Sequence, residues 1–244
     1  GEMAKGSIHF PGWSVSGYPD GQNEMVLVAG GRSPESQWLK LTLRGRKVWG
    51  IDRGCRNISQ VGALPVGATG DFDTLFSSEL SQLARVGVFI SQHPADKEYT
   101  DLELALSDSS QRCPETSHFW VAGAFGGRMD HLIGNLRTLA SCRDKGHKVY
   151  GMMDDKEAVL LIRGGEKIKV SFQNTPPIIS MIPLTSLIRG AALKGCHWKL
   201  PKKDWEALEM PPISNRLAEG SKEVEFTISE GMAALYFCWE EKGL

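Results

Sequence analysis

The sequence predicts an α/β N-terminal domain with a mainly parallel sheet and helices on its faces, followed by an all-β, sandwich-like C-terminal domain. From Met25 to about Ala140, short apolar runs alternate with stretches whose apolar residues follow helical spacing, a pattern typical of parallel sheets covered by helices. Beyond Met152 the pattern changes to short apolar runs between Gly- and Pro-containing turns, which is typical of antiparallel sheets. The resulting division is an unassigned N-terminal extension at residues 1–23, an α/β domain at 24–152 and a β domain at 153–244.

Composition narrows the class of protein. The 244 residues are 41% hydrophobic and 23% charged, with a formal net charge of −1, so no basic field favours a nucleic-acid partner. The five cysteines form no Cys-x-x-Cys pair, and we expect reduced thiols in a cytoplasmic protein. No run of 18 apolar residues is present, and the first residues lack the apolar core of a signal peptide, so we expect no membrane partner.

The first two predicted strands each end in a polar or glycine-rich segment. Met25–Ala29 is followed by Gly30-Gly31-Arg32 and then by Ser33-Pro34, a good N-cap and first turn for a helix. The glycines would let the backbone approach an anion, although a plain tight turn is the alternative. Lys47–Ile51 ends in Asp52-Arg53-Gly54, which places a carboxylate at the close of a strand.

Gly70-Asp71-Phe72-Asp73-Thr74 follows the next apolar run. In an extended backbone Asp71 and Asp73 would share one face and Phe72 would point into the core. Two adjacent carboxylates repel each other unless a cation lies between them. Mg²⁺ held by one or two carboxylates and substrate phosphates is the predicted solution, and an ordinary loop turn is the alternative.

A helix at Leu75–Gly87 and a strand at Val88–Ser91 lead to a charged segment, Asp96–Glu103. Thr100 and Glu103 have the spacing of a capping box, and Asp101 in the first turn suits the helix dipole. This structural account does not cover the preceding pair of charged residues. Lys97 and Glu98 are candidates for contacting phosphate and metal, or they lie in a solvated loop.

A strand at His118–Phe125 precedes a second glycine loop, Gly126-Gly127-Arg128-Met129-Asp130-His131, and a further helix. Arg128 is suited to bind phosphate oxygens with its fork of donors, and the pattern favours a structural hydrogen bond over catalysis for His131. Gly-x-Gly-x-x-Gly is absent from the sequence, which argues against a dinucleotide cofactor. The candidate strands of the C-terminal domain are Ala158–Ile162, Lys167–Phe172, Ile178–Ile182, Val224–Ile228 and Ala233–Cys238.

Taken together, these motifs resemble the thiamine pyrophosphokinase family. The resemblance rests on Gly70–Thr74, on Lys97 with Thr100–Leu106, and on Gly126–His131 with Asn135, in the family's order. It is clear from about Val26 to Ala140 and continues weakly through Gly195–Leu200 and Ser214-Asn215. Two positions depart from the family: Lys97-Glu98 stands where Lys-Asp is frequent, and Ile51-Asp52-Arg53-Gly54 stands where Ala-Asp-Gly-Gly is frequent.

The resemblance implies a reaction, in which diphosphate passes from ATP to the hydroxyl of thiamine and gives thiamine diphosphate and AMP. It also implies Mg²⁺, a catalytic ATP-binding domain at 24–152, a thiamine-binding and dimerisation domain at 153–244, and a homodimer with active sites at the subunit interface. The implied metal ligands are Asp71, Asp73 and Asp101, with Glu98 as a fourth candidate; the implied ATP-binding residues are Gly126, Gly127, Arg128, Asp130, Lys97 and Thr100. Asp71, Asp73, Asp101 and Arg128 are the implied catalytic residues, and Ser214, Asn215 and Trp198 are implied for thiamine.

The departures at Arg53 and Glu98 leave two other classes of function open. One is a thiamine- or nucleotide-binding module that has lost transfer activity. The other is an unrelated Mg²⁺-dependent nucleotide hydrolase. A binding module would form no AMP, and a hydrolase would form AMP without thiamine, so a single assay separates all three.

Overall fold

The structure is a computed structural model, and it describes residues 6–73, 75, 77–96, 98, 100–200, 203–206, 208–211 and 215–240. The chain forms two compact units. The α/β unit comprises Gly21–Asp155, and the β unit comprises Gly1–Asp20 together with Lys156–Leu244. Because the β unit takes chain from both ends, the α/β unit is an insertion into it.

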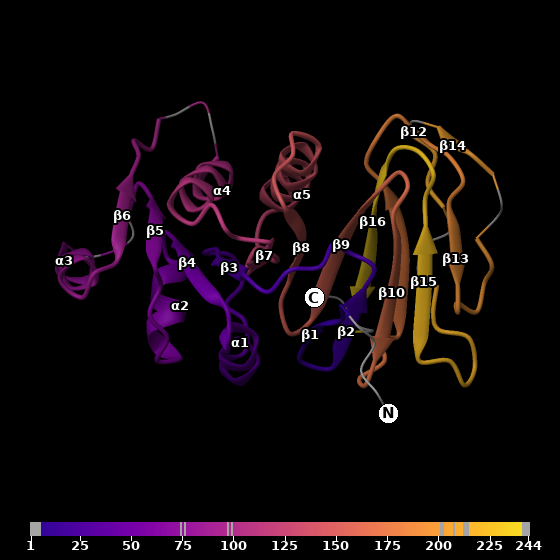
Figure 1. Cartoon of the computed structure of the whole chain (residues 1–244), viewed down its shortest axis with the longest axis horizontal. Helices are drawn as coiled ribbons and strands as arrows, with labels where there is room; N and C mark the ends of the chain where they lie inside the picture. Colours follow the sequence, from indigo (N-terminus) through magenta and orange to yellow (C-terminus); the bar gives the residue numbers. More distant parts are fainter. Residues whose placement is uncertain are drawn as a thin grey trace. The chain divides into compact units, whose positions relative to one another are not determined.

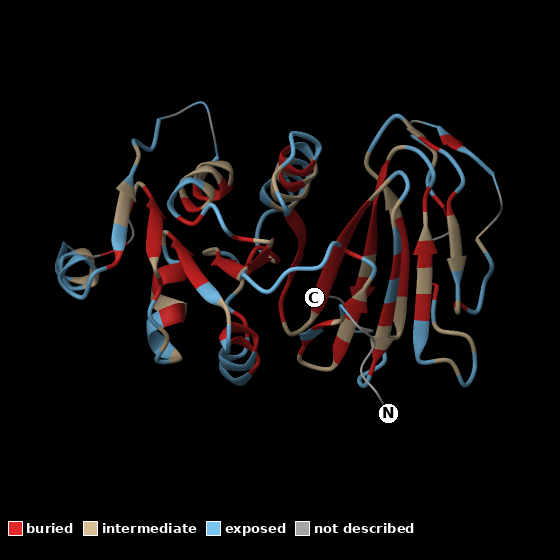
Figure 2. Ribbon diagram, viewed as in Figure 1, coloured by how far each residue is buried: buried red, intermediate tan, exposed pale blue. Residues whose placement is uncertain are grey.

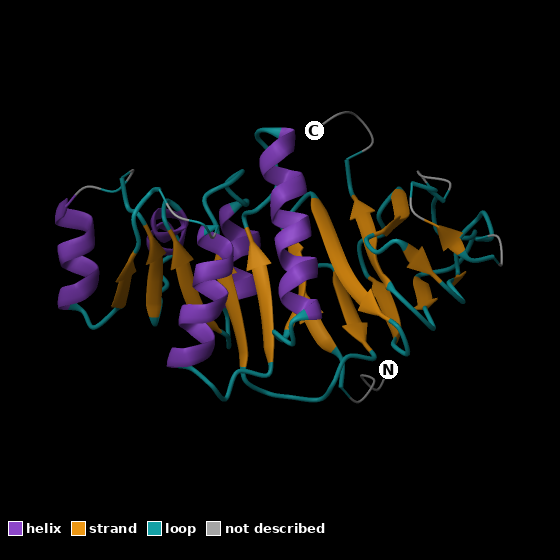
Figure 3. Ribbon diagram, turned by 90° about the horizontal axis from the view of Figure 1, so that it is seen from above, coloured by secondary structure: helices purple, strands orange, loops and turns teal. Residues whose placement is uncertain are grey.

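Strands and helices alternate throughout the α/β unit (Figure 3). They are β3 (Glu24–Val28), α1 (Ser36–Leu43), β4 (Lys47–Ile51), α2 (Gly54–Gln60), β5 (Gly67–Gly70), α3 (Ser77–Arg85), β6 (Phe89–Gln92), α4 (Asp101–Arg112), β7 (His118–Ala122), α5 (Met129–Asp144) and β8 (Val149–Met153). The strands are hydrogen-bonded in the order β8-β7-β3-β4-β5-β6, and every neighbouring pair in this series is parallel.

The helices of this unit lie on the two faces of its sheet (Figure 1). α4 packs on β4 and β5, and α5 packs on β8, on one face, while α1 and α2 lie on the other. Every residue of β7 and β8 is buried, as expected for strands that are covered from both sides (Figure 2). The sheet is therefore covered on both faces, and the loops extend from the ends of its strands.

The β unit consists of antiparallel strands. They are β1 (Ile8–Phe10), β2 (Trp13–Ser16), β9 (Glu157–Arg163), β10 (Lys167–Phe172), β11 (Ile178–Pro183), β12 (Leu187–Ile188), β13 (Ala192–Lys194), β14 (Trp205–Glu206), β15 (Glu223–Thr227) and β16 (Met232–Cys238). One sheet has the order β1-β2-β10-β15-β13, another region has β11-β16-β9, and β12 pairs with β14. The rings of Trp13 and Phe172, from the first sheet, pack against Phe237 of β16. The β-rich C-terminal region that the sequence predicts is confirmed.

Two local expectations differ from the structure. Residues 1–23 were left without an assigned structure by the sequence pattern, but β1 and β2 lie there, and β2 pairs with β10 through Val15 and Val170. The predicted N-cap at Ser33 is wrong because Glu35 takes that role. Its carboxylate accepts the N–H groups of Gln37 at 3.0 Å and Trp38 at 2.9 Å, and α1 begins at Ser36.

Candidate active site

Four segments singled out by the sequence follow adjacent strands of the α/β unit. Residues 29–33 follow β3, residues 52–53 follow β4, residues 71–73 follow β5 and residues 123–128 follow β7. Because these strands are parallel, the four segments lie at one edge of the sheet. The chain proceeds from β3 to β4 on one side, whereas β7 lies on the other side, so the strand order reverses between β3 and β7. Ligands of open α/β sheets bind at such a reversal.

Asp52 is at the centre of an acidic group at this edge. Its carboxylate lies against Gly70, where any Cβ would overlap it, and it accepts the N–H of Phe72 at 3.0 Å. Burial raises the pKa of Asp52 to about 7; a hydrogen bond with Asp101 and the charges of Asp101 and Asp71 act in the same direction. Asp52, Asp71 and Asp101 therefore form one electrostatically coupled group, which we call the acidic cluster.

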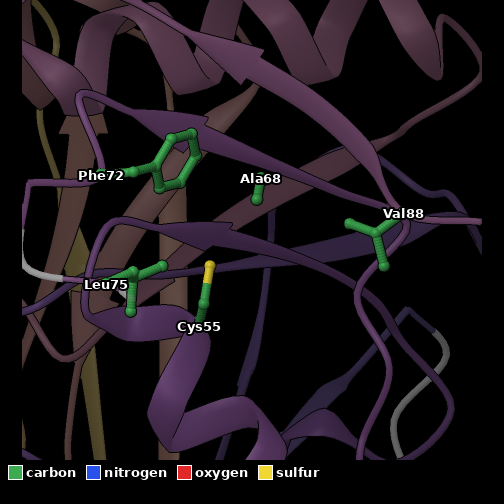
Figure 4. Close-up of a cluster of buried hydrophobic side chains, with 5 residues drawn as sticks. All are labelled: Cys55, Ala68, Phe72, Leu75 and Val88. Carbon is green, nitrogen blue, oxygen red and sulfur yellow. The ribbon is translucent and has the colours of Figure 1, made fainter. Parts of the chain in front are cut away.

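The segment from Asp71 to Asp73 is a turn. Phe72 has a φ of 62°, so the extended geometry expected from the sequence is wrong. The Asp73 N–H donates to Asp71 Oδ1 at 3.0 Å, which holds the turn closed. Phe72 is nonetheless buried as expected, and it packs with Cys55, Ala68, Leu75 and Val88 (Figure 4). The turn leaves Asp71 half-buried and Asp73 exposed.

Asp101 enters the acidic cluster from the first turn of α4. Thr100 caps this helix, because its Oγ1 accepts the Glu103 N–H at 3.2 Å. Glu98 is exposed, and the structure gives it no contact with the acidic cluster. Lys97 and Thr74 lie outside the described residues.

A polar network that the sequence pattern did not indicate joins α4 to β5. Trp49 Nε1 donates to Thr69 Oγ1 at 2.9 Å, and Thr69 Oγ1 donates to Asp108 Oδ2 at 2.7 Å. The same carboxylate oxygen lies 3.2 Å from His93 Nε2, and the backbone N–H of His93 donates to the Gly70 carbonyl at 2.9 Å. Asp108 is two turns along the helix that carries Asp101, so the network fixes α4 relative to the end of β5.

The acidic cluster suits a hard divalent cation, because every side chain in it offers carboxylate oxygens. Within the described part of the chain, no three His, Cys, Asp or Glu side chains are close enough to form a complete metal site. This agrees with the chemistry of Mg²⁺, which is held by one or two carboxylates and completes its shell with water and substrate phosphates. The hydrogen bond between Asp52 and Asp101 requires a proton, and a bound cation would take the place of that proton.

The second half of the edge consists of two glycine loops in direct contact. The Gly31 N–H donates to the Gly123 carbonyl at 2.8 Å, and the Arg32 N–H donates to the Phe125 carbonyl at 2.8 Å. A Cβ at Gly31 would lie 2.6 Å from the Gly123 carbonyl oxygen, so only glycine allows this approach. Arg32 anchors the first loop through Asp154, with Nη2 at 2.6 Å from Oδ2.

The loop after β7 carries the predicted ATP-binding residues. Gly126 and Gly127 have φ values of 77° and 73°, in the left-handed region that glycine favours. Arg128 and Asp130 are exposed and paired, with Nη2 at 2.6 Å from Oδ2, and this hydrogen bond lowers the pKa of Asp130. If Arg128 bound a nucleotide, its guanidinium would leave the Asp130 carboxylate and pair with a phosphate group instead.

The residues predicted for thiamine belong to the β unit. Asn215 is buried and holds the backbone of Trp198 from both sides: Oδ1 accepts the Trp198 N–H at 3.0 Å, and Nδ2 donates to the Trp198 carbonyl at 2.7 Å. Trp198 is 52% exposed, and the Arg216 guanidinium lies 5.0 Å from its ring centroid. Asn215 thus positions an exposed aromatic ring. Ser214 lies outside the described residues.

Comparison with known proteins finds a family to which this edge of the sheet is similar. Residues 40–151, which contain the acidic cluster and the loop after β7, match the family described as "Thiamin pyrophosphokinase, catalytic domain". The chain is 28% identical over 151 residues to a thiamine pyrophosphokinase of Bacillus subtilis, and these residues cover 62% of this chain and 69% of that protein.

Solved structures give the same result over more of the chain. A thiamin pyrophosphokinase family protein from Enterococcus faecalis is 26% identical with a TM-score of 0.72, covering 90% of this chain and all of that one. The fold is also shared with thiamine pyrophosphokinase from Bacillus subtilis, at a TM-score of 0.75, 23% identity and coverage of 89% and 100%. The motifs, the matched residues and the fold agree, and each likens this chain to thiamine pyrophosphokinases.

Proposed function

We propose that the protein is a thiamine diphosphokinase, which transfers diphosphate from ATP to the hydroxyl of thiamine and releases AMP. The observation that carries this proposal is the acidic cluster beside two packed glycine loops, at the strand reversal and inside the matched residues 40–151. In the transfer, the thiamine hydroxyl oxygen bonds to the β-phosphorus of ATP. The bond from this phosphorus to the α-phosphate oxygen breaks, and the hydroxyl proton passes to a base.

This chemistry depends on alignment and on neutralising negative charge. Mg²⁺ held by one or two of the carboxylates of Asp71, Asp73 and Asp101 would supply positive charge to the phosphate oxygens. Asp52 is added to the metal-site candidates because it is coupled to two of these carboxylates. Arg128 would bind a phosphate through its guanidinium, and Gly126 and Gly127 would let the backbone approach the nucleotide. Asp130, Thr100, Lys97 and Glu98 keep the supporting roles that the family resemblance implies.

Thiamine would be held by the β unit. Trp198 offers an exposed aromatic face, and such a face attracts a cationic ring like the thiazolium. Asn215, in this proposal, acts by fixing the Trp198 backbone, and Ser214 remains a predicted pyrimidine contact. We further propose a homodimer in which each active site combines the phosphate-binding residues of one subunit with the thiamine-binding residues of the other.

Two findings bear on the compartment. All five cysteines are free and buried, which supports a reducing cytoplasm. Among the described residues, no helix combines the length and apolar character needed to cross a membrane.

The test is an incubation of the purified protein with ATP, MgCl₂ and thiamine, followed by chromatographic separation of the products. We expect AMP and thiamine diphosphate in equal amounts, and neither product when thiamine is omitted. AMP formed at the same rate without thiamine would identify a nucleotide hydrolase. Binding of both substrates without any AMP would identify a binding module.

A further inference from the structure

Arg53 stands between the two halves of the candidate active site. It follows Asp52 directly at the end of β4, and its Nη2 donates to the Gly30 carbonyl in the loop after β3 at 2.7 Å. The acidic cluster lies toward β5 and α4, whereas the glycine loops lie toward β3 and β7. The guanidinium therefore lies against the first glycine loop, and the Arg53 backbone directly follows Asp52 of the acidic cluster.

Arg53 differs from the other arginines that follow strands at this edge. Arg32 is paired with Asp154 and Arg128 with Asp130. Arg53 is exposed, and among the residues that the structure describes its only hydrogen-bond partner is a neutral backbone carbonyl. Within the described part of the chain, no carboxylate pairs with its guanidinium.

The backbone does not require this residue. Arg53 has ordinary helical φ and ψ values of −59° and −19°, which any residue can adopt. The next residue is constrained, because a Cβ at Gly54 would overlap the Val28 carbonyl. Position 53 can carry a long side chain without backbone strain. Backbone geometry therefore does not explain why this residue is an arginine.

We infer that Arg53 binds the phosphate chain of the nucleoside triphosphate. A phosphate chain that reaches from the glycine loops after β3 and β7 to a cation at the acidic cluster crosses the end of β4, which Arg53 follows. Arginine presents five N–H donors in a planar fork, and one of its terminal nitrogens already anchors it on Gly30. This inference rests on the proposed function, since it takes ATP as the ligand of this edge.

The test compares Arg53→Gln with the wild-type protein and with Arg44→Gln, an exposed arginine at the far end of α1. The ligand is the magnesium complex of α,β-methylene-ATP, in which the bond that the reaction would break cannot be cleaved. Calorimetry should show binding about tenfold weaker in Arg53→Gln, equivalent to about 1.4 kcal/mol, and unchanged in Arg44→Gln. Arg53→Lys should fall between wild type and Arg53→Gln because it keeps the charge but loses the fork.

The affinity for adenosine, measured by competition against the analogue, separates the loss of a phosphate contact from general damage to the binding site. Its affinity should change less than twofold in Arg53→Gln, and thermal melts should coincide with the wild type. In turnover, the KM for ATP should rise while the KM for thiamine stays constant. Unchanged affinity for the analogue, or an equal loss for adenosine, would overturn the inference. A wild-type protein that binds the analogue without making thiamine diphosphate would instead refute only the proposed function.

Discussion

At the residue scale, the acidic cluster makes the metal-free protein sensitive to pH. Burial raises the pKa of Asp52 to about 7, whereas an unfolded chain leaves it near 3.8. Between these values the folded state binds more protons than the unfolded state, so stability falls as the pH rises. Above pH 7 the contribution levels off, because Asp52 is then ionised in both states.

Asp52→Asn should remove this contribution. With metal chelated by EDTA, we expect the variant to melt at a higher temperature than the wild type at pH 8, and the difference to shrink toward pH 4.5. Saturating Mg²⁺ should narrow the difference at pH 8, because a cation relieves the repulsion in the wild type. Parallel melting curves for the two proteins from pH 4.5 to 8 would show that Asp52 is not electrostatically coupled to Asp71 and Asp101.

Asp73→Asn tests chemistry at a position with little structural role. Asp73 is exposed, and its hydrogen bond to Asp71 is made by the backbone N–H rather than by the carboxylate. Turnover should fall by about 100-fold or more, which is typical when a group that stabilises charge in the transition state is lost. The melting temperature should stay within about two degrees of wild type, and steady-state kinetics over a range of Mg²⁺ give the result. Asp96→Asn, an exposed aspartate in the following loop, is the matched control, and wild-type turnover by Asp73→Asn would exclude Asp73 from the mechanism.

At the element scale, two glycines should respond oppositely to the same substitution. Gly31→Ala would place a Cβ 2.6 Å from the Gly123 carbonyl oxygen and 2.8 Å from that of Phe125, and we expect a loss of about 1–3 kcal/mol. Gly134→Ala lies within α5 with no atom within 4 Å of the new Cβ, and we expect a gain of about 0.5–1 kcal/mol. Chemical denaturation measures both. A neutral Gly31→Ala would mean that the two glycine loops are not packed as described.

Elements whose sequence pattern is self-contained could be predicted. Lys47–Ile51 and Lys167–Phe172 are strands with the predicted bounds, because their apolar patterns specify a strand without help from the rest of the chain. β1 and β2 could not, since β1 pairs with β2, and β2 pairs with β10, more than a hundred residues away. The start of α1 was misjudged for a similar reason: the Glu35 N–H is held by Asp155, a distant residue.

The candidate site likewise has features that could be predicted from the sequence and features that could not. The positions of Asp71 and Asp73 after a strand and of Asp101 at the start of a helix were predictable from the regular βα pattern, whereas their role as metal ligands stays a prediction. The left-handed turn at Phe72 was not predictable, because Phe rarely adopts a positive φ, and packing together with hydrogen bonds to Asp52 and Asp71 stabilises the turn there. The contact of Asp52 with Asp101 joins the residue after β4 to the first residue of α4, and spacing along the chain carries no signal for it.

At the scale of the whole molecule, the proposed shared site can be tested by exchanging subunits. The phosphate residues belong to the α/β unit and Trp198 belongs to the β unit. Trp198→Ala is a better probe of the thiamine site than Asn215→Ala, because Trp198 is 52% exposed whereas Asn215 is buried and holds the local backbone. Removing the indole should raise the KM for thiamine without disturbing the fold.

At a thiamine concentration far below the raised KM of Trp198→Ala, the Asp73→Asn and Trp198→Ala proteins should each be nearly inactive alone and partly active when mixed. If each site joins the α/β unit of one subunit to the β unit of the other, a mixed dimer carries one doubly damaged site and one intact site. Random exchange makes half of the dimers mixed, so activity should recover to about a quarter of the wild-type value. Thiamine diphosphate formation is measured before and after exchange, with size-exclusion chromatography confirming dimers. A site contained in one subunit keeps a lesion in every copy, so activity at the mean of the two parents would refute the shared site.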